Sequence, residues 1–376
     1  MRKRILHGFD WLLFLAALAL VGIGLIMIYS TYEANLSDGS DLLENNVFRQ
    51  GIFALAGVIV CVGAALIDYR VVVALAPWLY LSIVIVLGAT LALGNVSFGA
   101  QSWLDLELFF DIQPSELSKV LMILVIARYL GVDQDRLESV GPFLATGLLI
   151  IPPVILVYLQ PDFGTSLILA VTWAGMAFFA GVRWRHLAIL AVAGAIMVPI
   201  VWFQLEGYMQ ERVLLFFAPD QDPSGASYNV NQALISIGSG GFWGKGLLRG
   251  TQSQLYFLRV RHTDFVFSVL AEELGFVGSV LVIGLFAVLV LRLARIGATA
   301  SEPRGRLVAA GVTTMIFCQT VVNIGMNANL LPVTGLPLPL VSYGGSSLIT
   351  TLFALGLALG VGLRSRDPNP AYLAAR

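Results

Sequence analysis

The chain has 376 residues, of which 58% are hydrophobic and only 12% are charged, with a net charge of −1 and a mean hydropathy of +0.85. A soluble domain carries about twice that fraction of charged residues, so this composition excludes a globular protein that faces water on all sides. In lipid the backbone must satisfy its own hydrogen bonds, which leaves helices or a closed barrel. The apolar runs here are about twenty residues long, which is a helix length, and they do not alternate as barrel strands do.

Ten apolar segments are predicted to span the membrane, which makes this an all-α membrane protein with a single polytopic domain over residues 1–376. The first segment follows Met1-Arg-Lys-Arg4 and is predicted to be an uncleaved helix, because it is long for a signal peptide and no small-residue cleavage site follows it. In chain order the predicted spans are residues 11–30, 52–69, 72–94, 114–131, 142–159, 163–181, 186–203, 265–293, 307–326 and 343–364.

The placement of Lys and Arg predicts the orientation. Most of them lie between spans on the side that holds both termini, so this side is expected to be cytoplasmic. The longest connection, residues 204–263, then forms one long loop on the outer face. Its Leu and aromatic residues, and the stretch Gly238-Ser-Gly-Gly-Phe-Trp-Gly-Lys-Gly246, favour ordered structure over a flexible linker.

Two ionisable residues fall inside the fourth predicted span. Such residues cost about 2.5–3.5 kcal/mol each on insertion scales and commonly mark function. Glu116 and Lys119 are three apart in a helix that begins near Pro114, so they share a face and can pair. Two interpretations stay open: the pair is a structural contact, or it lines a polar cavity that meets an anionic or metal-bound substrate.

Three carboxylates lie where the outer loop enters the eighth span. Counting back from Arg292 at 1.5 Å per residue places Glu272 and Glu273 near the outer interface and Asp264 about two turns further out. The two glutamates are either hydrogen-bonded interfacial structure or part of a site. Asp264 is either a helix N-cap, as Thr263 could also be, or a catalytic carboxylate.

Other polar residues are expected at the same outer end. Asp162 lies in a short connection that reads as a turn, and Arg49 borders the second span as an interfacial or functional arginine. Residues 329–347 are apolar but broken by Pro and Gly, which predicts a re-entrant segment. With Arg212 of the long loop, these residues predict a polar chamber open to the outside. Such a chamber suits an enzyme acting on lipid-linked substrates, a transporter or a channel.

Four motifs together resemble the SEDS family, named for shape, elongation, division and sporulation. They are Gln113-Pro-Ser-Glu-Leu-Ser-Lys119, Leu159-Gln-Pro-Asp-Phe-Gly-Thr165, His262-Thr-Asp-Phe265 with Ala271-Glu-Glu-Leu-Gly275, and Leu338-Pro-Leu-Val-Ser-Tyr-Gly-Gly-Ser-Ser347. Gly335-Leu-Pro-Leu-Pro-Leu340 is more similar to the elongation branch of the family than to the division branch.

The resemblance implies a glycosyltransferase that polymerises lipid II into glycan strands outside the cytoplasmic membrane, with a fold related to the GT-C class of polytopic glycosyltransferases. It matches Asp264 to the family's essential aspartate. The other matched positions belong to the family's central cavity and outer region: Glu116, Lys119, Asp162, Arg49 and Arg212.

The resemblance also implies a partner, a class B penicillin-binding protein that crosslinks the strands. Lipid II and membrane lipids are the other expected ligands, and no nucleic acid is expected. The sequence has no His and Cys cluster, so any metal would be a hard cation such as Mg²⁺ held by oxygen atoms. The alternative function is a lipid II flippase, which would need access from both sides of the membrane.

Overall fold

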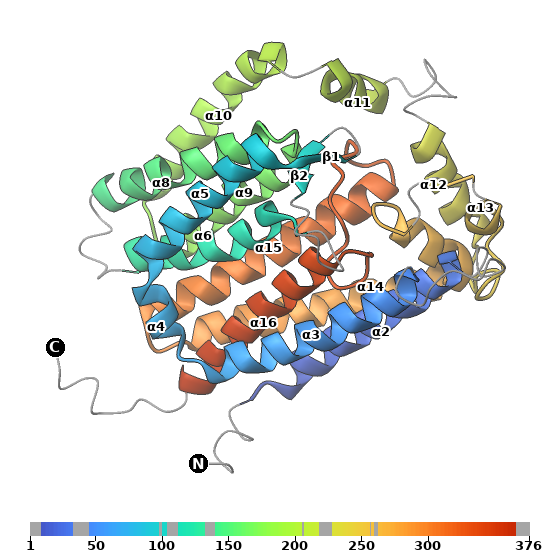
Figure 1. Cartoon of the computed structure of the whole chain (residues 1–376), viewed down its shortest axis with the longest axis horizontal. Coiled ribbons are helices and arrows are strands. Elements are labelled where there is room, and N and C mark those ends of the chain that lie inside the picture. Colours follow the sequence, from blue (N-terminus) through green and yellow to red (C-terminus); the bar gives the residue numbers. More distant parts are fainter. Residues whose placement is uncertain are drawn as a thin grey trace.

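The computed structural model describes residues 9–32, 45–97, 100–103, 112–131, 140–204, 207–217, 228–255, 257–258 and 262–365, and almost all of its regular structure is helical (Figure 1). One small antiparallel pair of strands, β1 (Asn95–Ser97) and β2 (Ala100–Trp103), is present. The long helices are α2 (Trp11–Tyr32), α3 (Asn46–Leu66), α5 (Ala76–Leu93), α6 (Pro114–Leu130), α8 (Val140–Tyr158), α9 (Phe163–Ala180), α10 (Trp184–Gln204), α14 (Val266–Thr299), α15 (Pro303–Asn327) and α16 (Gly345–Ser365).

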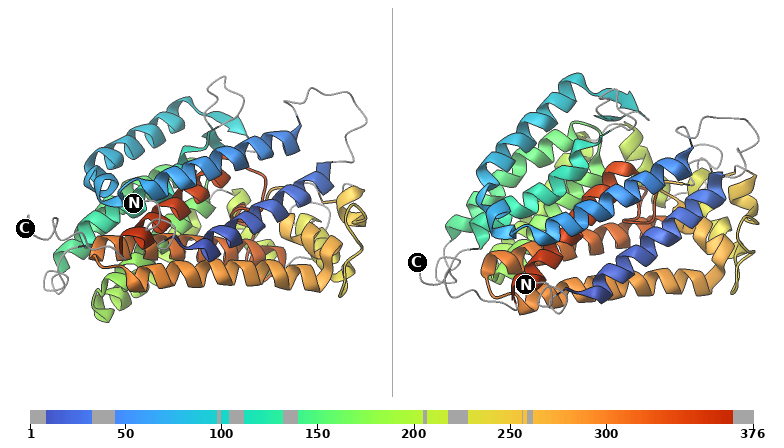
Figure 2. Two further views of the ribbon diagram at one scale, coloured as in Figure 1. Left: turned by 90° about the horizontal axis from the view of Figure 1, so that it is seen from below. Right: turned by 60° about the horizontal axis from the view of Figure 1, so that its bottom comes forward.

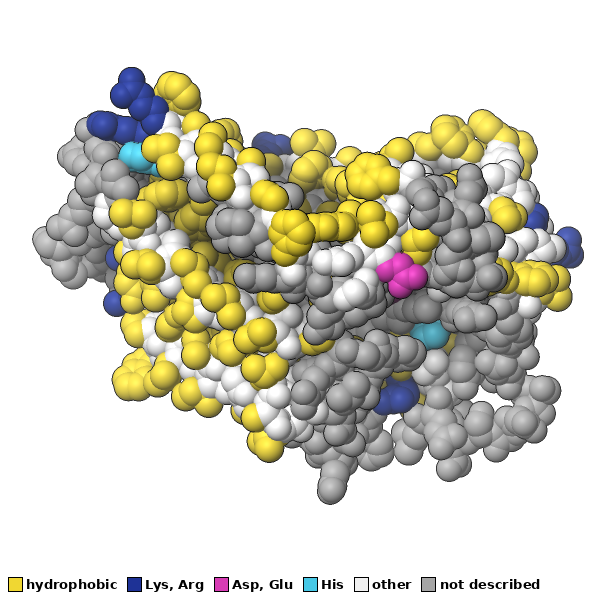
Figure 3. Space-filling model, turned by 90° about the horizontal axis from the view of Figure 1, so that it is seen from above, with side chains coloured by type: hydrophobic (Ala, Val, Ile, Leu, Met, Phe, Trp, Pro, Cys, Tyr) yellow, Lys and Arg dark blue, Asp and Glu magenta, His cyan; other side chains and the backbone are white. Residues whose placement is uncertain are grey.

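Each of the ten predicted spans coincides with one of these helices, so the prediction of a helical membrane protein is confirmed. Eight of them are long and apolar enough to cross a membrane: α2, α3, α5, α8, α9, α14, α15 and α16. The other two are α6, which has 17 residues and is largely buried by its neighbours, and α10, whose apolar part is shorter. Figure 3 shows a face of the molecule on which hydrophobic side chains predominate, as a lipid-facing surface requires.

Two predicted boundaries are wrong for local reasons. The second and third spans were expected to meet near residue 70, but a short helix, α4 (Tyr69–Ala74), lies between them. Asp68 caps α4 by accepting a hydrogen bond from Arg70 N at 3.0 Å. Pro77 then lies in the first turn of α5, where its missing N–H costs nothing. The third membrane helix therefore begins at Ala76.

The long outer loop is ordered as predicted wherever it is described. It contains α11 (Gly207–Phe217), α12 (Tyr228–Ser239) and α13 (Thr251–Gln254). Its glycine-rich part packs on α14, where Gly275 adopts a left-handed φ of 69° and interrupts the helix. Lys245 N and Gly246 N donate to the carbonyls of Glu272 and Glu273, each at 3.0 Å. The loop thus satisfies backbone groups that the interruption would leave unpaired.

The two glutamates beside this interruption hold the loop. Glu272 Oε1 accepts from Lys245 Nζ at 2.7 Å and from Thr251 Oγ1 and Gln252 N at 3.0 Å. Glu273 accepts a hydrogen bond from Ser30 Oγ of α2. Of the two interpretations, the structure favours hydrogen-bonded structure for both residues.

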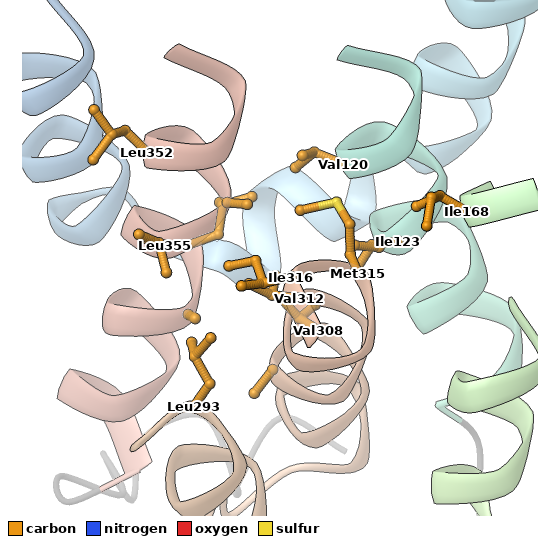
Figure 4. Packing of buried hydrophobic residues seen from close by; sticks show 14 of the residues in the cluster. Val120, Ile123, Ile168, Leu293, Val308, Val312, Met315, Ile316, Leu352 and Leu355 are labelled. Carbon is orange, nitrogen blue, oxygen red and sulfur yellow. The ribbon is translucent and has the colours of Figure 1, made fainter. Parts of the chain in front are cut away.

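The hydrophobic core surrounds α15, which packs against α14, α9, α6 and α16. Figure 4 shows Val308, Val312 and Met315 of α15 among side chains of these neighbours, including Ile123 and Leu355. Figure 2 shows α2, α3 and α14 extending along the outside of this arrangement. The polar residues at the ends of α6, α14 and α15 are therefore attached to the best-packed part of the molecule.

The two ends of the described chain meet at one end of the bundle. Asp10 and Ser365 line the same small pocket as Arg292, whose guanidinium binds the Asp10 carboxylate at 2.6 Å. The predicted re-entrant segment, residues 329–347, lies at the other end of α15 and α16; residues 329–344 have no helix or strand, whereas its last three residues form the start of α16. Its Leu336, Leu338 and Val341 are buried, which confirms that the segment folds back into the bundle.

Candidate active site

The ion pair of α6 lies in its first two turns. Lys119 Nζ donates to Glu116 Oε1 at 2.8 Å, and the two side chains are only 2% and 3% exposed. The predicted pairing is therefore present. Glu116 Oε2 is also buried and has no hydrogen-bond partner among the described residues. An unsatisfied buried acceptor costs about 1–3 kcal/mol, but Glu272 Oε2 and Glu273 Oε2 of α14 are in the same position, so both interpretations of the pair stay open.

Asp162 joins this pair through the start of α9. It is the N-cap residue of α9, and its Oδ1 accepts from Thr165 N at 3.0 Å. Its Oδ2 accepts from Gln113 Nε2 at 3.2 Å and from Ser115 Oγ at 3.1 Å, both at the start of α6. The turn expected around Asp162 is therefore also a contact between two helices.

Burial raises the pKa of the Asp162 carboxyl, and the nearby negative charge of Glu116 acts in the same direction. The hydrogen bonds from Thr165 and the positive charge of Lys119 oppose this rise in pKa. The structure thus brings Glu116, Lys119 and Asp162 within electrostatic reach of one another, as predicted.

Asp264 is half-buried immediately before α14. The N-cap residue of α14 is Phe265, whose side chain makes no capping hydrogen bond. Asn327 of α15 instead places its Oδ1 3.2 Å from Ser268 N and 2.6 Å from Ser268 Oγ, so a neighbouring helix supplies the capping oxygen. Neither Asp264 nor Thr263 occupies the cap position. The N-cap residue of α14 is therefore Phe265, one residue beyond Asp264.

The backbone of Asp264 is held by two amides. Asn323 Nδ2 donates to the Asp264 carbonyl oxygen at 3.1 Å, and Asn327 Nδ2 donates to the same oxygen at 2.9 Å. Asn323 and Asn327 are fully buried. Asn323 Nδ2 also donates to Leu336 O of the re-entrant segment at 2.7 Å. The Asp264 backbone, α15 and the re-entrant segment are thus fixed to one another.

The re-entrant segment connects Asp264 to the cluster of Glu116, Lys119 and Asp162. Tyr343 N donates at 2.9 Å to His262 O, two residues before Asp264 in the chain. Three residues later Ser346 Oγ accepts from Gln113 N at 3.1 Å. Since Gln113 also bonds to Asp162, a short series of hydrogen bonds joins the two groups of carboxylates at one end of the bundle.

The structure describes the side chain of Arg49 but not that of Arg212. Arg49 is half-buried in the first turn of α3, next to Gln50. Gln50 donates from Nε2 to Ser342 O at 3.3 Å and accepts from Gly344 N at 3.2 Å, so Arg49 lies beside the re-entrant segment. Arg212 belongs to α11, but its side chain lies outside the described part of the chain.

Asn323, Asn327 and Gln50 were missed in the sequence. A signal was available, because Gln319, Asn323 and Asn327 recur every four residues in or beside an apolar span and therefore share one helical face. Polar residues in a membrane helix usually face the bundle interior and find partners there. Within the described ranges no group of three His, Cys, Asp or Glu side chains lies close enough to hold a metal ion.

Residues 10–366 match the family model for FtsW, RodA and SpoVE, described as cell cycle proteins. The chain belongs to the FtsW/RodA/SpoVE family. The family resemblance inferred from the four motifs is confirmed. In this family the chain is 41% identical over 341 residues to the peptidoglycan glycosyltransferase MrdB of Escherichia coli K12, which covers 89% of this chain and 90% of that one.

A second relative is the probable peptidoglycan glycosyltransferase FtsW of Geobacter sulfurreducens, 36% identical over 378 residues and covering 96% of both chains. Two solved structures are also similar. One belongs to a peptidoglycan synthase complex that coordinates polymerization and crosslinking, with a TM-score of 0.80 and 34% identity. The other is the rod shape determining protein RodA of Thermus thermophilus, with a TM-score of 0.68 and 32% identity. Each comparison covers 96% of this chain and 98% of the other.

Proposed function

We propose that this protein is a peptidoglycan glycosyltransferase that polymerises lipid II into glycan strands for cell elongation and rod shape, with Asp264 as its catalytic carboxylate. The observation that carries the proposal is the fixed position of Asp264 at the end of the bundle that holds the re-entrant segment and the cluster of Glu116, Lys119 and Asp162. Asp264 is half-buried there, and Asn323 and Asn327 of α15 hold its backbone. The names of the relatives supply the reaction class.

The reaction requires a base. The acceptor sugar hydroxyl attacks the anomeric carbon of a sugar on a lipid pyrophosphate, and a new C–O bond forms as the bond to the pyrophosphate breaks. Asp264 accepts the hydroxyl proton, a role worth about 10²–10⁴-fold in rate. Asp264 is half-buried at this end of the bundle.

The leaving pyrophosphate carries developing negative charge, which fixed cations stabilise. Lys119 uses one N–H on Glu116 and retains two for a phosphate oxygen. Arg49 and Arg212 are the further cations we assign to this task.

The site is proposed to face the outside of the cytoplasmic membrane. The end of the bundle that holds Asp10, Arg292 and Ser365 belongs to the Lys- and Arg-rich side and is assigned to the cytoplasm. Asp264 and the re-entrant segment lie at the opposite end of the long helices. The polymerised strands would pass to a class B penicillin-binding protein, in keeping with the similar chain found in a peptidoglycan synthase complex.

The test is glycan polymerisation by the purified complex with its transpeptidase partner, supplied with lipid II in detergent. Long glycan strands are the expected product. A flippase has no membrane to act across in detergent and would yield no glycan. A scaffold that only holds the transpeptidase would also yield no glycan. The absence of polymer from a folded complex would therefore contradict the proposal in favour of the flippase or scaffold.

A further inference from the structure

Two buried asparagines meet at one backbone atom beside the proposed catalytic residue. Asn323 Nδ2 and Asn327 Nδ2 lie 3.1 Å and 2.9 Å from the carbonyl oxygen of Asp264. Both asparagines are fully buried, one turn apart on α15. A carbonyl oxygen has two lone pairs, so the two amides saturate it.

The remaining atoms of the two side chains are also engaged. Asn327 Oδ1 accepts from both the backbone N–H and the hydroxyl of Ser268, and Asn323 Nδ2 also donates to Leu336 O at 2.7 Å. Asn327 Nδ2 donates to Asn323 O at 2.9 Å as well. Neither side chain can rotate without breaking several buried hydrogen bonds, each costly to leave unmade.

We infer that Asn323 and Asn327 are positioning residues, which hold the Asp264 backbone so that its carboxylate points at the acceptor hydroxyl. The arrangement replaces a local cap with one supplied by α15, the central helix of the core. A base on a loop before a helix would otherwise move with the fraying of that helix end. Since a misplacement of about 1 Å can cost about 10²-fold in rate, such an anchor acts on turnover.

This inference rests on the proposed function and adds two residues to it. Neither asparagine needs to touch substrate. Their loss should therefore lower kcat and leave KM and lipid II binding nearly unchanged. A residue with a merely structural role would instead lower the amount of folded protein and leave kcat per folded molecule unchanged.

The experiment compares Asn323→Leu and Asn327→Leu with wild type in the purified complex, using lipid II as substrate. We expect kcat per folded molecule to fall at least about 10-fold and KM to stay within about 3-fold. Gln319→Leu is the matched control. This substitution removes another buried amide from α15. Gln319 Nε2 has no hydrogen-bond partner among the described residues, so the variant should retain the wild-type kcat.

A second variant separates capping from positioning. Asn327→Asp keeps an oxygen to accept from Ser268 N but loses the N–H donors to the Asp264 and Asn323 carbonyls. A fall in its kcat supports positioning, whereas wild-type kcat means that Asn327 only caps α14 and overturns its positioning role. If Asn327→Leu does not fold, Asn323→Leu and Asn327→Asp decide the question.

The two proposals fail in different ways. If Asp264→Asn is inactive while both Asn323→Leu and Asn327→Leu turn over at the wild-type rate, only the positioning inference is overturned. If Asp264→Asn remains fully active, the assignment of the base itself is wrong.

Discussion

Lys119 donates a hydrogen bond to Glu116 across 2.8 Å, one turn apart on α6, in a part of the bundle where both side chains are almost completely buried. Within the described residues, each of the two charges is compensated by its partner in this ion pair. Removing one member of such a pair leaves an uncompensated buried charge, which costs about 3–5 kcal/mol. Replacing both by apolar or neutral groups of similar size is often nearly neutral.

This pair gives the first prediction. Lys119→Met should lower the thermal stability of the protein in detergent markedly, and adding Glu116→Gln should recover most of that loss. Polymerisation should stay low in both variants, because the cation that stabilises the leaving pyrophosphate is missing. Thermal unfolding and a glycan assay on the same samples measure the two effects. Wild-type polymerisation by the stable double variant would show that the pair is only structural.

Asp162 gives a prediction about pH. Its folded-state pKa is raised, chiefly by burial, so the folded protein binds the proton more tightly than the unfolded chain does. The free energy of unfolding should therefore fall as the pH rises from the unfolded pKa of about 3.9 through the folded pKa. Asp162→Asn removes this titration. The Tm of wild type relative to the variant should decrease as the pH is raised through that window.

A matched control is available for this measurement. Asp68 also caps a helix, by accepting from Arg70 N at 3.0 Å, but its side chain is 30% exposed. Asp68→Asn therefore reports the loss of a capping carboxylate without deep burial. Parallel Tm profiles for wild type and Asp162→Asn would show that the burial of Asp162 has no titratable consequence.

The interruption of α14 gives a third prediction. Gly275 has a φ of 69°, and a Cβ there would overlap Gly244 N of the outer loop. Gly275→Ala combines backbone strain of about 1–3 kcal/mol with this overlap, so it should lower the Tm and weaken the attachment of the loop. Limited proteolysis of residues 239–258 would detect the loosened loop.

Gly284→Ala is the control on the same helix. A Cβ at Gly284 meets no atom within 4 Å, and alanine favours a helix by up to about 1 kcal/mol over glycine. This variant should be as stable as wild type or slightly more so. If Gly275→Ala behaves in the same way, the close contact between the loop and the interrupted helix is not a stabilising feature.

Features that depend on local order along the chain could be predicted. The apolar runs predicted the ten long helices, and the spacing of Glu116 and Lys119 predicted their pairing. The Pro and Gly residues of the segment before α16 predicted its non-helical, re-entrant path, because helical backbone is interrupted at such residues.

Features that depend on contacts between distant parts of the chain could not be predicted from the sequence. The segment around Asp162 has the composition of a simple turn. The hydrogen bonds of Asp162 to Gln113 and Ser115 form only when α6 and α9 pack together. Asp264 looks like an N-cap because Asp before an apolar helix usually is one. The competing cap, Asn327, lies 59 residues from Ser268 in the sequence. No local pattern could indicate that it fills this position.

The most direct test of the central claim is the rate of glycan polymerisation by Asp264→Asn in the purified complex with the transpeptidase, alongside its binding of lipid II. The substitution keeps the shape of the side chain and removes its ability to accept a proton. We expect folding and lipid II binding to be retained and the rate to fall by at least about 10²-fold. Polymerisation at the wild-type rate would contradict the account.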